Sequence, residues 1–413
     1  MKVLQINTVC GVGSTGRIML QIHQALKQRG HESYIAYGRE PAKNCEGAIR
    51  IGSDFDVYHH VLITRLFDLH GFGSKKATKK FLNTVGKIDP DIIHLHNIHG
   101  YYLNVEVLFD FLKTSNKPVV WTLHDCWAFT GHCSYFLYVG CERWKTGCYS
   151  CPAKKYYPKS VLLDNSKNNH GRKKRIFTGV KNLTIVTPSK WLAGLVKQSF
   201  LAEYPVEVIP NGIDTEVFKP TPSDFRKEHG LEGKFIILGV ANVWEKRKGF
   251  DYFIELSKYL AEDEIIVLVG ISDEQLKKLP KNVIGIKRTN SPKELAEIYT
   301  AADVFLNLTL EDNYPTVNLE AQACGTYVIT FDSGGAGETI FNANTGFVVK
   351  ERHLPAIYEM VVSARRRELN IFRKKPPENL LEKFSKETFV KNYILLYQKM
   401  FSNARETKDS TGG

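Results

Sequence analysis

The chain has 413 residues, of which 43% are hydrophobic and 24% are charged, and this composition is typical of a water-soluble globular protein. Its length exceeds what one hydrophobic core supports and predicts two domains of similar size. No apolar run approaches the roughly 20 residues of a transmembrane helix. Met1 leads directly into a strand-like pattern, so we expect no signal peptide and a cytoplasmic location.

The net charge of +12 is concentrated in the first half of the chain. Residues 1–200 hold 28 Lys and Arg against 13 Asp and Glu, whereas the remainder holds 28 against 31. A basic half favours an anionic partner, such as a nucleic acid, an acidic membrane surface or a phosphorylated substrate. A solvated basic face that aids solubility is the alternative.

Strand-like and helix-like segments alternate through the first half. The first strand, Val3–Asn7, is followed by a glycine-rich loop and a helix over Ile18–Arg29. Further strands are expected at Ser33–Tyr37, Asp91–Leu95, Val119–Leu123 and Leu183–Val186. These β-branched and apolar runs suit strands that are buried on both faces, as in a parallel sheet between helices.

The glycine-rich loop contains Gly11, Gly13 and Gly16 in the spacing GxGxxG, between a strand and a helix. This spacing matches the dinucleotide fingerprint, and Arg39 and Glu40 follow the second strand, where a ribose or its 2′-phosphate would be read. The same glycines let the backbone approach any phosphate or sugar, so NADP is only one of the ligands that this pattern allows.

Three histidines lie at and after one strand end, at His94, His96 and His99. Two histidines at i and i+2 can ligate a metal, but the sequence fixes no third ligand. We favour acceptor-side hydrogen bonding or packing for this group. His124 and Asp125 follow the next strand and belong to the same edge of the predicted sheet.

Four of the eight cysteines crowd into an insertion at about residues 126–160, in the pattern C-x7-C-x6-C-x2-C: Cys133, Cys141, Cys148 and Cys151. Disulfides are rare in the cytoplasm, and four close thiols suit a structural zinc site, which would give a coreless insertion its folding energy. Free thiols and disulfides are the alternatives. The other four, Cys10, Cys45, Cys126 and Cys324, are interpreted as ordinary buried thiols.

Basic and aromatic residues are mixed downstream of the cysteines, in Lys154–Lys159 and Arg172–Phe177. Such a mixture could bind RNA or the surface of an anionic bilayer. No RNA-binding motif is present, so we expect no nucleic acid partner.

The second half repeats the alternation of strands and helices. The expected strands are Phe235–Val240, Ile265–Val269, Val283–Ile286, Val304–Leu308 and Tyr327–Thr330, and the expected helices are Tyr252–Leu260, Lys293–Ala301 and Val317–Cys324. Two doubly wound α/β domains fit this order best, with a boundary near Val206–Lys219. We therefore predict domains at 1–206 and 207–385, an amphipathic helix at 386–401 that packs back across them, and a disordered tail at 402–413.

Two segments of the second domain combine charges with a parallel-sheet edge. Glu245–Gly249 follows the first strand of this domain and presents adjacent cations, which suit an anionic diphosphate, although a solvated basic turn is the alternative. Asp312–Gly325 runs from a loop into a helix and carries Asp312 and Glu320, eight positions apart. Ligands of open parallel sheets bind at this edge, and a helix N-terminus favours anions. The two segments together predict a nucleotide-sugar site.

The motifs resemble the retaining glycosyltransferases of family 4, which include enzymes that build bacterial surface polysaccharides and have two Rossmann-like domains facing a cleft (the glycosyltransferase-B fold). The resemblance covers nearly the whole chain. Besides the glycine loop and the acid pair, it includes Thr122–Asp125, Thr187–Lys190, Val208–Asp214 and Arg247–Gly249.

The resemblance implies a role for each acid of the pair. Glu320 is expected to hold the nucleotide ribose, and Asp312 to contact the donor sugar. The family usually has Glu at the first position, so the hydroxyl that the shorter Asp312 contacts is expected to differ.

The resemblance also assigns the charges at the leaving group. Lys248 corresponds to the family lysine that stabilises the departing diphosphate. The arginine commonly found five positions before Arg247 is Asn242 here, so we expect Arg247 to supply that charge. His124 is expected to contact the transferred sugar, and a structural histidine at a strand end is the alternative.

These inferences define three sets of residues. The expected catalytic residues are His124, Lys248, Arg247 and Asp312. The expected donor-binding residues are Gly13, Asn242, Arg247, Lys248, Asp312, Asn313, Tyr314, Pro315, Thr316, Val317 and Glu320. The expected acceptor-side residues are Gly11, Gly16, His96 and Asp125.

Together with the nucleotide-sugar site, the resemblance implies a retaining hexosyltransferase that moves a sugar from a nucleoside-diphosphate sugar to a glycan or a polyprenyl-diphosphate-linked acceptor in the interdomain cleft. No catalytic cofactor or metal is expected, because the two cations would take over the electrostatic role of a metal. The basic edge would hold the enzyme at the anionic inner face of the cell membrane. The alternatives are an NADP-dependent oxidoreductase, a non-catalytic RNA- or membrane-binding protein, and a nucleotide-sugar-isomerising enzyme on the same fold.

Overall fold

The computed structural model describes residues 1–366 and 376–411 and divides the chain into two compact units. The first unit comprises residues 1–210 together with the chain from Val390 onward, and the second comprises Asn211–Phe389. Each unit has its own sheet and its own hydrophobic core.

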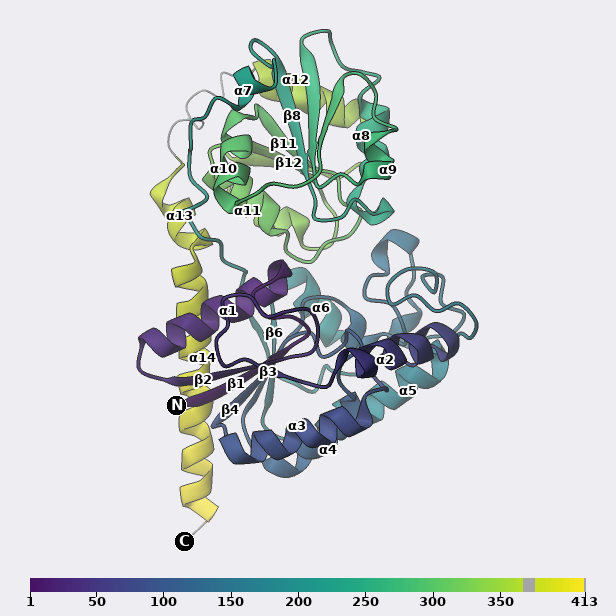
Figure 1. Ribbon diagram of the computed structural model, residues 1–413, viewed down its shortest axis with the longest axis vertical. Coiled ribbons are helices and arrows are strands. Elements are labelled where there is room, and N and C mark those ends of the chain that lie inside the picture. The colour runs from purple at the N-terminus through teal and green to yellow at the C-terminus, as the bar shows by residue number, and fades with distance from the viewer. Residues whose placement is uncertain (367–375, 412–413) are drawn as a thin grey trace. The chain divides into compact units, whose positions relative to one another are not determined.

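The first unit is built on a parallel sheet, whose strands β1, β2, β4 and β6 are labelled in Figure 1. Its described strands are seven in number, in the order β3-β2-β1-β4-β5-β6-β7. The strands are β1 Lys2–Asn7, β2 Glu32–Tyr37, β3 Ile49–Arg50, β4 Ile92–Leu95, β5 Val119–Thr122, β6 Leu183–Thr187 and β7 Val206–Val208. The order reverses between β1 and β4, and such a switch point lies where open parallel sheets bind ligands.

Helices cover both faces of this sheet. They are α1 Gly13–Gln28, α2 Asp54–Phe67, α3 Lys75–Ile88, α4 Val105–Ser115, α5 Ser166–Phe177, α6 Lys190–Lys197 and the part of α14 from Val390. On one face, Leu4 and Ile93 join the core that includes residues of α3 and α4. On the other face, Gln5 and His94 are register partners that contact α1 and α14. The alternation follows from the period of two along a strand.

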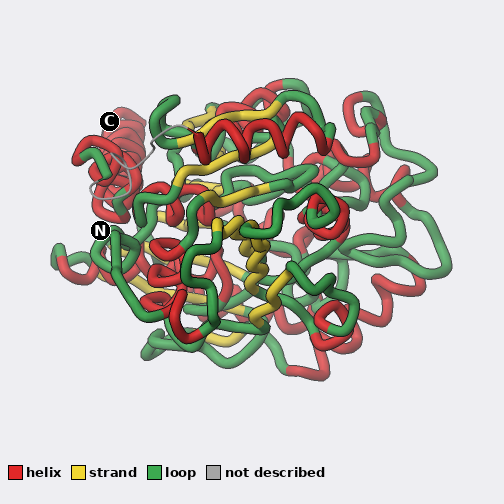
Figure 2. Tube along the Cα trace, turned by 90° about the horizontal axis from the view of Figure 1, so that it is seen from above, coloured by secondary structure: helices red, strands yellow, loops and turns green. Residues whose placement is uncertain are grey.

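The second unit has a parallel sheet of six described strands in the order β10-β9-β8-β11-β12-β13. The strands are β8 Phe235–Val240, β9 Glu264–Val269, β10 Val283–Ile286, β11 Val304–Asn307, β12 Tyr327–Phe331 and β13 Gly346–Val349. The helices are α7 Phe225–Glu228, α8 Phe250–Leu256, α9 Asp273–Leu276, α10 Pro292–Ala301, α11 Thr316–Ala323, α12 Leu354–Arg366 and α13 Glu378–Phe384. In Figure 2, the strands (yellow) are flanked by helices (red). The predicted α/β class with two Rossmann-like units is confirmed.

The end of the chain differs from its prediction. Helix α14 spans Lys386–Thr411, so the expected disorder from residue 402 is wrong for the described part, and residues 412–413 lie outside it. The run Asn403–Lys408 contains neither Gly nor Pro. A helix that is already nucleated propagates through such residues at low cost.

The cysteine-rich insertion is not coreless, contrary to its prediction. Its described regular structure consists of three short 3-10 helices, η1 Trp127–Phe129, η2 Leu137–Val139 and η3 Arg143–Lys145. Phe129, Phe136 and Trp144 are buried in the core of the first unit, and their rings contact one another with centroids 5.1–6.4 Å apart. The insertion thus folds on its own aromatic side chains, which the sequence shows as scattered Phe and Trp residues.

Candidate functional site

Two loops of the second unit meet at the carboxyl edge of β8 and β11. The loop after β8 contains η4 (Lys246–Lys248) and ends at Gly249, whose φ is +80°. A Cβ at this position would lie 2.1 Å from the carbonyl oxygen of Leu308, so only glycine fits. The amide of Leu310 donates to the carbonyl oxygen of Arg247 at 2.7 Å and joins the loops.

Lys248 and Asp312 form an ion pair between these loops. Lys248 Nζ lies 2.5 Å from Asp312 Oδ2, and the side chains are 27% and 14% exposed. Asp312 Oδ1 accepts from the amide of Asn313 at 2.8 Å. Burial alone would raise the pKa of Asp312, but the charges of Lys248 and Arg247 outweigh it and hold the pKa below its ordinary value. Asp312 is therefore ionised at neutral pH.

Arg247 is held against the same loop. Its Nη1 donates to the carbonyl oxygen of Glu311 at 2.6 Å. The hydroxyl of Thr309 donates to the carbonyl oxygens of both Arg247 and Glu311, at 3.3 and 3.2 Å. These contacts bring Arg247, Lys248 and Asp312 together, as the sequence predicts, and concentrate positive charge at this edge.

A third loop, after β12, fixes the backbone of Asp312. Gly334 pairs with Asp312 in an isolated parallel bridge, and Gly335 donates its amide to the carbonyl oxygen of Asp312 at 2.9 Å. Gly334 has a φ of +67°, and a Cβ there would lie 2.1 Å from the same carbonyl oxygen. The position of the first acid is thus set by three loops.

Glu320 lies in the second turn of α11 and is only 7% exposed. The hydroxyl of Tyr299, on α10, donates to Glu320 Oε2 at 3.1 Å in a buried contact. Burial and the nearby carboxylate raise the pKa of Tyr299 well above its ordinary value, so this hydroxyl remains a donor. Sequence reasoning missed Tyr299, because its pattern is that of an ordinary core residue of an amphipathic helix.

Helix α11 is anchored by buried amide side chains. Asn318 accepts from Asn307 Nδ2 and donates to Thr339 Oγ1, both at 2.8 Å. No side chain caps the N-terminus of α11 at Pro315. Because Pro315 has no N–H, the backbone hydrogen-bond donors expected to bind the nucleotide come from the other residues of 313–317. Among the predicted donor residues, Asn313 and Tyr314 are buried and Asn242 is exposed.

The glycine loop of the first unit turns directly into α1. Gly11 has a φ of +70°, and a Cβ there would lie 1.9 Å from the carbonyl oxygen of Lys43. Helix α1 begins at Gly13 with no side-chain cap. The amide of Gly11 donates a hydrogen bond to the carbonyl oxygen of Gly16 at 3.2 Å. The strand-turn-helix context that the motif requires is present. Arg39, the residue expected to read a 2′-phosphate, lies over the ring of Tyr101 at 5.5 Å.

His124 and His96 lie next to each other at the ends of β5 and β4. Their rings are stacked, with centroids 5.5 Å apart, and His96 Nδ1 lies 3.2 Å from His124 Nε2. His96 Nε2 lies 3.2 Å from Gln5 Oε1 on β1. Burial lowers the pKa of His124 to about 4, although the nearby Asp125 opposes the shift. His124 is therefore neutral at pH 7, and its predicted contact with a sugar stays a prediction.

His94 connects the sheet to α14. Its Nε2 lies 2.7 Å from Thr122 Oγ1, and its Nδ1 lies 2.6 Å from the hydroxyl of Tyr397. The hydroxyl of Tyr393 lies 2.9 Å from Thr122 Oγ1. His94 is thus packed and hydrogen-bonded within the first unit, as the packing alternative for this histidine group predicts, and acceptor-side hydrogen bonding stays a prediction.

Asp125, His99 and Tyr157 form a chain of polar contacts that sequence reasoning missed. His99 Nε2 lies 3.0 Å from Asp125 Oδ2, and its Nδ1 lies 3.2 Å from the hydroxyl of Tyr157. Burial would raise the pKa of Asp125, but His99, the amide of Trp127 and His124 together outweigh it and keep the pKa below its ordinary value. The sequence shows that His99 lies close to His96 in the chain, but it does not show that Tyr157 of the insertion is the partner of His99.

The cysteines differ from their predictions in one respect. Cys10 and Cys45 form a disulfide, so their interpretation as free buried thiols is wrong. The adjacent parallel strands β1 and β2 bring the two following loops together, which the separation of 35 residues concealed. Cys126 and Cys324 are buried thiols, as predicted. In the described chain, no three His, Cys, Asp or Glu side chains are grouped to hold a metal ion. Zinc at the four clustered cysteines remains a prediction.

Comparisons with known proteins match both units. The model of "Glycosyltransferase Family 4" matches residues 15–217, and that of "Glycosyl transferases group 1" matches residues 222–362. WcaC of Escherichia coli (strain K12), named as a candidate colanic acid biosynthesis glycosyl transferase, is 26% identical over 86% of this chain and 89% of its own. The UDP-Gal:alpha-D-GlcNAc-diphosphoundecaprenol alpha-1,3-galactosyltransferase of Escherichia coli is 26% identical over 40% of this chain and 47% of its own.

A solved structure shows the same fold. Anabaena Alr3699/HepE in complex with UDP-glucose aligns with a TM-score of 0.65 at 14% identity and covers 99% of this chain and 100% of its own.

Proposed function

Because the chain belongs to glycosyltransferase family 4, we propose that this glycosyltransferase takes its sugar from a nucleoside-diphosphate donor and transfers it with retention of configuration. The observation that carries the proposal is the group formed by Arg247, Lys248 and Asp312 at one sheet edge. An anionic leaving group requires cations there, and a sugar requires a fixed hydrogen-bond acceptor. Both are present in one unit.

Different residues of the second unit would bind the diphosphate, the sugar and the ribose of the donor. Arg247 and Lys248 would face the diphosphate and stabilise the charge that develops as the sugar departs. Asp312 would accept a hydrogen bond from a sugar hydroxyl, because its carboxylate is ionised and its backbone is fixed by three loops. Glu320 would take the ribose hydroxyls, with Tyr299 holding its second oxygen.

Retention follows most simply from attack on the same face that the diphosphate leaves. The acceptor oxygen would form its bond to the anomeric carbon as the bond to the phosphate oxygen breaks, and the phosphate oxygen would take the acceptor's proton. The two cations would supply the positive charge for this step, so the proposal includes no metal ion and no cofactor.

We further propose that the acceptor is a glycan or a lipid-diphosphate-linked sugar, in polysaccharide biosynthesis. The relatives support this proposal, since one is named for colanic acid biosynthesis and another for transfer to a diphosphoundecaprenol-linked sugar.

Peripheral contact with an anionic membrane belongs to the same proposal. Phe55, Tyr58 and Leu62 lie on one face of α2 and are 78%, 73% and 54% exposed. Val161–Leu163 continue this apolar surface at 54–62% exposure, and the amide of Val161 donates to the carbonyl oxygen of Arg65 at 2.7 Å. Exposed apolar side chains on a basic unit suit an anionic bilayer surface. In the described residues, no helix is long and apolar enough to cross a membrane.

A thermal-shift panel of UDP-, GDP-, ADP- and CMP-sugars tests the donor proposal. One family of nucleotides should raise the melting temperature of the wild type, because a ligand of the folded state stabilises it. The Glu320→Gln variant should lose most of that shift. A protein that responds to NADP(H) and to none of the nucleotide sugars would contradict the proposal.

Flotation with phosphatidylglycerol vesicles and with phosphatidylcholine vesicles tests the membrane contact. The protein should float only with the anionic vesicles, and a Phe55→Ser/Leu62→Ser variant should float less at equal charge. Equal flotation of the variant would refute a role for this face of α2.

A further inference from the structure

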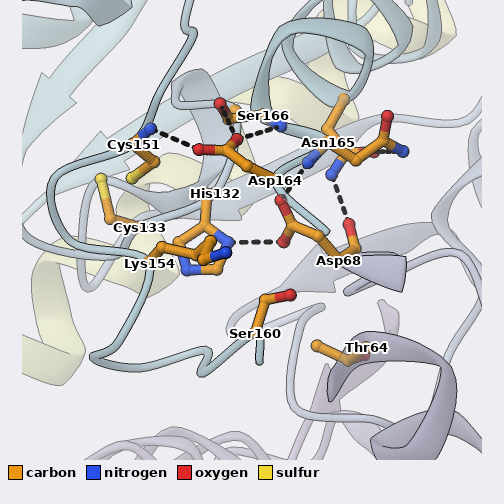
Figure 3. A network of polar contacts seen from close by, with 12 residues as sticks. Thr64, Asp68, His132, Cys133, Cys151, Lys154, Ser160, Asp164, Asn165 and Ser166 are labelled. Carbon is orange, nitrogen blue, oxygen red and sulfur yellow. Dashed lines mark hydrogen bonds and ion pairs between the residues drawn. The ribbon is translucent and has the colours of Figure 1, made fainter. Parts of the chain in front are cut away.

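The four clustered cysteines occupy different environments. Cys133 and Cys151 are neighbours whose thiols interact, and Figure 3 shows their sulfurs side by side. Cys148 is buried and accepts the amide of Gly131 on Sγ at 3.1 Å. Cys141 packs at the border of the core as a half-buried thiol. The described geometry is thus a contacting pair, Cys133 and Cys151, with Cys141 and Cys148 as neighbours.

The two members of the pair differ in access. Cys133 is 5% exposed, whereas Cys151 is half-buried and accessible from the surface. A small reagent therefore reaches Cys151 first.

A polar network, buried at Asp68 and His132 and exposed at Asp164, holds the two segments in place without a bond between the sulfurs (Figure 3). His132, next to Cys133, has its Nδ1 2.5 Å from Asp68 Oδ1, and both side chains are almost fully buried. Asp164 Oδ2 accepts the amide of Cys151 at 2.6 Å. Asp68 Oδ2 also accepts the amide of Asn165 at 2.9 Å, which ties the two anchors together.

We propose that Cys133 and Cys151 form an oxidisable dithiol, a modification site at which a hydroperoxide closes a disulfide. With hydrogen peroxide, the sulfur of Cys151 attacks one oxygen, the O–O bond breaks, and a sulfenic acid and water form. The sulfur of Cys133 then attacks that of Cys151, the S–O bond breaks, and a second water leaves. Two thiols are oxidised to one disulfide, and one peroxide is reduced to two waters.

The disulfide would act on a defined part of the first unit. Cys151 precedes Tyr157 by six residues, and the hydroxyl of Tyr157 contacts His99, the partner of Asp125. Closing the pair fixes the start of the segment that carries this hydroxyl. The site is independent of the proposed donor chemistry, which lies in the second unit.

The full-length protein is purified, freed of reductant without air and treated with one equivalent of hydrogen peroxide. We expect the intact mass to fall by two hydrogen atoms, and peptide mapping to find Cys133 linked to Cys151. Cys148→Ser is the matched control and should close the same disulfide. Cys133→Ser should stop at a sulfenic acid on Cys151, which dimedone traps.

Mapping of the wild type does not depend on the folding of any variant. A disulfide between other members of the cluster, or no oxidation of Cys151, would overturn the proposal. So would about one equivalent of zinc by elemental analysis, with all four thiols protected from alkylation until a chelator is added.

Discussion

The charge of Lys248 is the sharpest test of the donor site. Replacing this lysine with alanine removes the cation that lies 2.5 Å from Asp312 and leaves the carboxylate, which is 14% exposed, with less positive charge nearby. The residue is itself only partly exposed, at 27%, so the charge that it offers to a diphosphate is incompletely screened.

The magnitude follows from the environment of Lys248. A unit charge about 3 Å from a phosphate oxygen contributes ~1.4 kcal/mol at the dielectric constant of water and ~5.5 kcal/mol at an effective constant of about 20. Because the side chain is about three-quarters covered, we expect an intermediate loss of roughly 3–4 kcal/mol in the transition state. This corresponds to a fall in kcat on the order of 10²–10³-fold.

The assay follows release of the nucleoside diphosphate from the donor found by thermal shift. Lys246→Ala is the matched control, because Lys246 lies in the same 3-10 helix and is exposed to solvent. The control should keep its kcat within about twofold. Lys248→Arg should recover part of the lost rate, since it restores the charge but changes its shape. If Lys248→Ala kept nearly full kcat while remaining folded, the assignment of this lysine to the leaving group would be wrong.

Three further results are expected. Glu320→Gln should weaken nucleotide binding by about 10–100-fold in calorimetry, because a charged acceptor for the ribose hydroxyls becomes a neutral one; unchanged affinity would contradict the ribose assignment. His124 has a folded pKa of about 4, below its ordinary value of 6.5, so its contribution to stability is complete above pH 6.5 and is lost as the pH falls toward 4. Urea unfolding of wild type and His124→Gln should therefore differ in pH dependence over that interval, and parallel curves would refute the buried neutral imidazole. Tyr397→Phe should lower the free energy of unfolding by about 1–3 kcal/mol, because His94 Nδ1 loses its partner, whereas Tyr34→Phe, whose hydroxyl bond is exposed, should cost under about 0.5 kcal/mol.

The fold could be predicted from the sequence because its signals are local. β8 and β10 have the predicted bounds, and the buried runs of Val, Ile and Leu suit only strands covered on both faces. The short strand β3 was missed, since two residues carry no periodicity, whereas a short strand was expected at the domain boundary, where β7 lies. Helix α2 was also missed. Its apolar residues Phe55, Tyr58 and Leu62 are exposed, so they do not belong to the buried face by which an amphipathic helix is usually identified.

The candidate site was predictable in part, for a different reason. Arg247, Lys248 and Asp312 follow strands that are neighbours in the sheet, so topology alone brings them together. Two contacts of the site depend on how loops and helices pack: the ion pair of Lys248 with Asp312 and the hydrogen bond from Tyr299 to Glu320. The spacing of these residues in the sequence does not predict either contact. The disulfide between Cys10 and Cys45 was missed because cysteine pairing depends on which loops adjoin.

The shape of the Asp312 loop bears on the departure from the family pattern. A shorter acid reaches less far than glutamate, but its backbone here is tied by Gly334, Gly335 and the amide of Asn313. A carboxylate on a fixed backbone and a short stem has few rotamers, so it selects among sugar hydroxyls by position. Asp312→Glu would add one methylene at a site where Lys248 already contacts the carboxylate, and the longer side chain would have to displace that contact. We therefore expect the substitution to change the preferred sugar of the donor more than its affinity for the nucleotide. Competition binding with the free nucleotide and with a set of its sugars would separate the two effects.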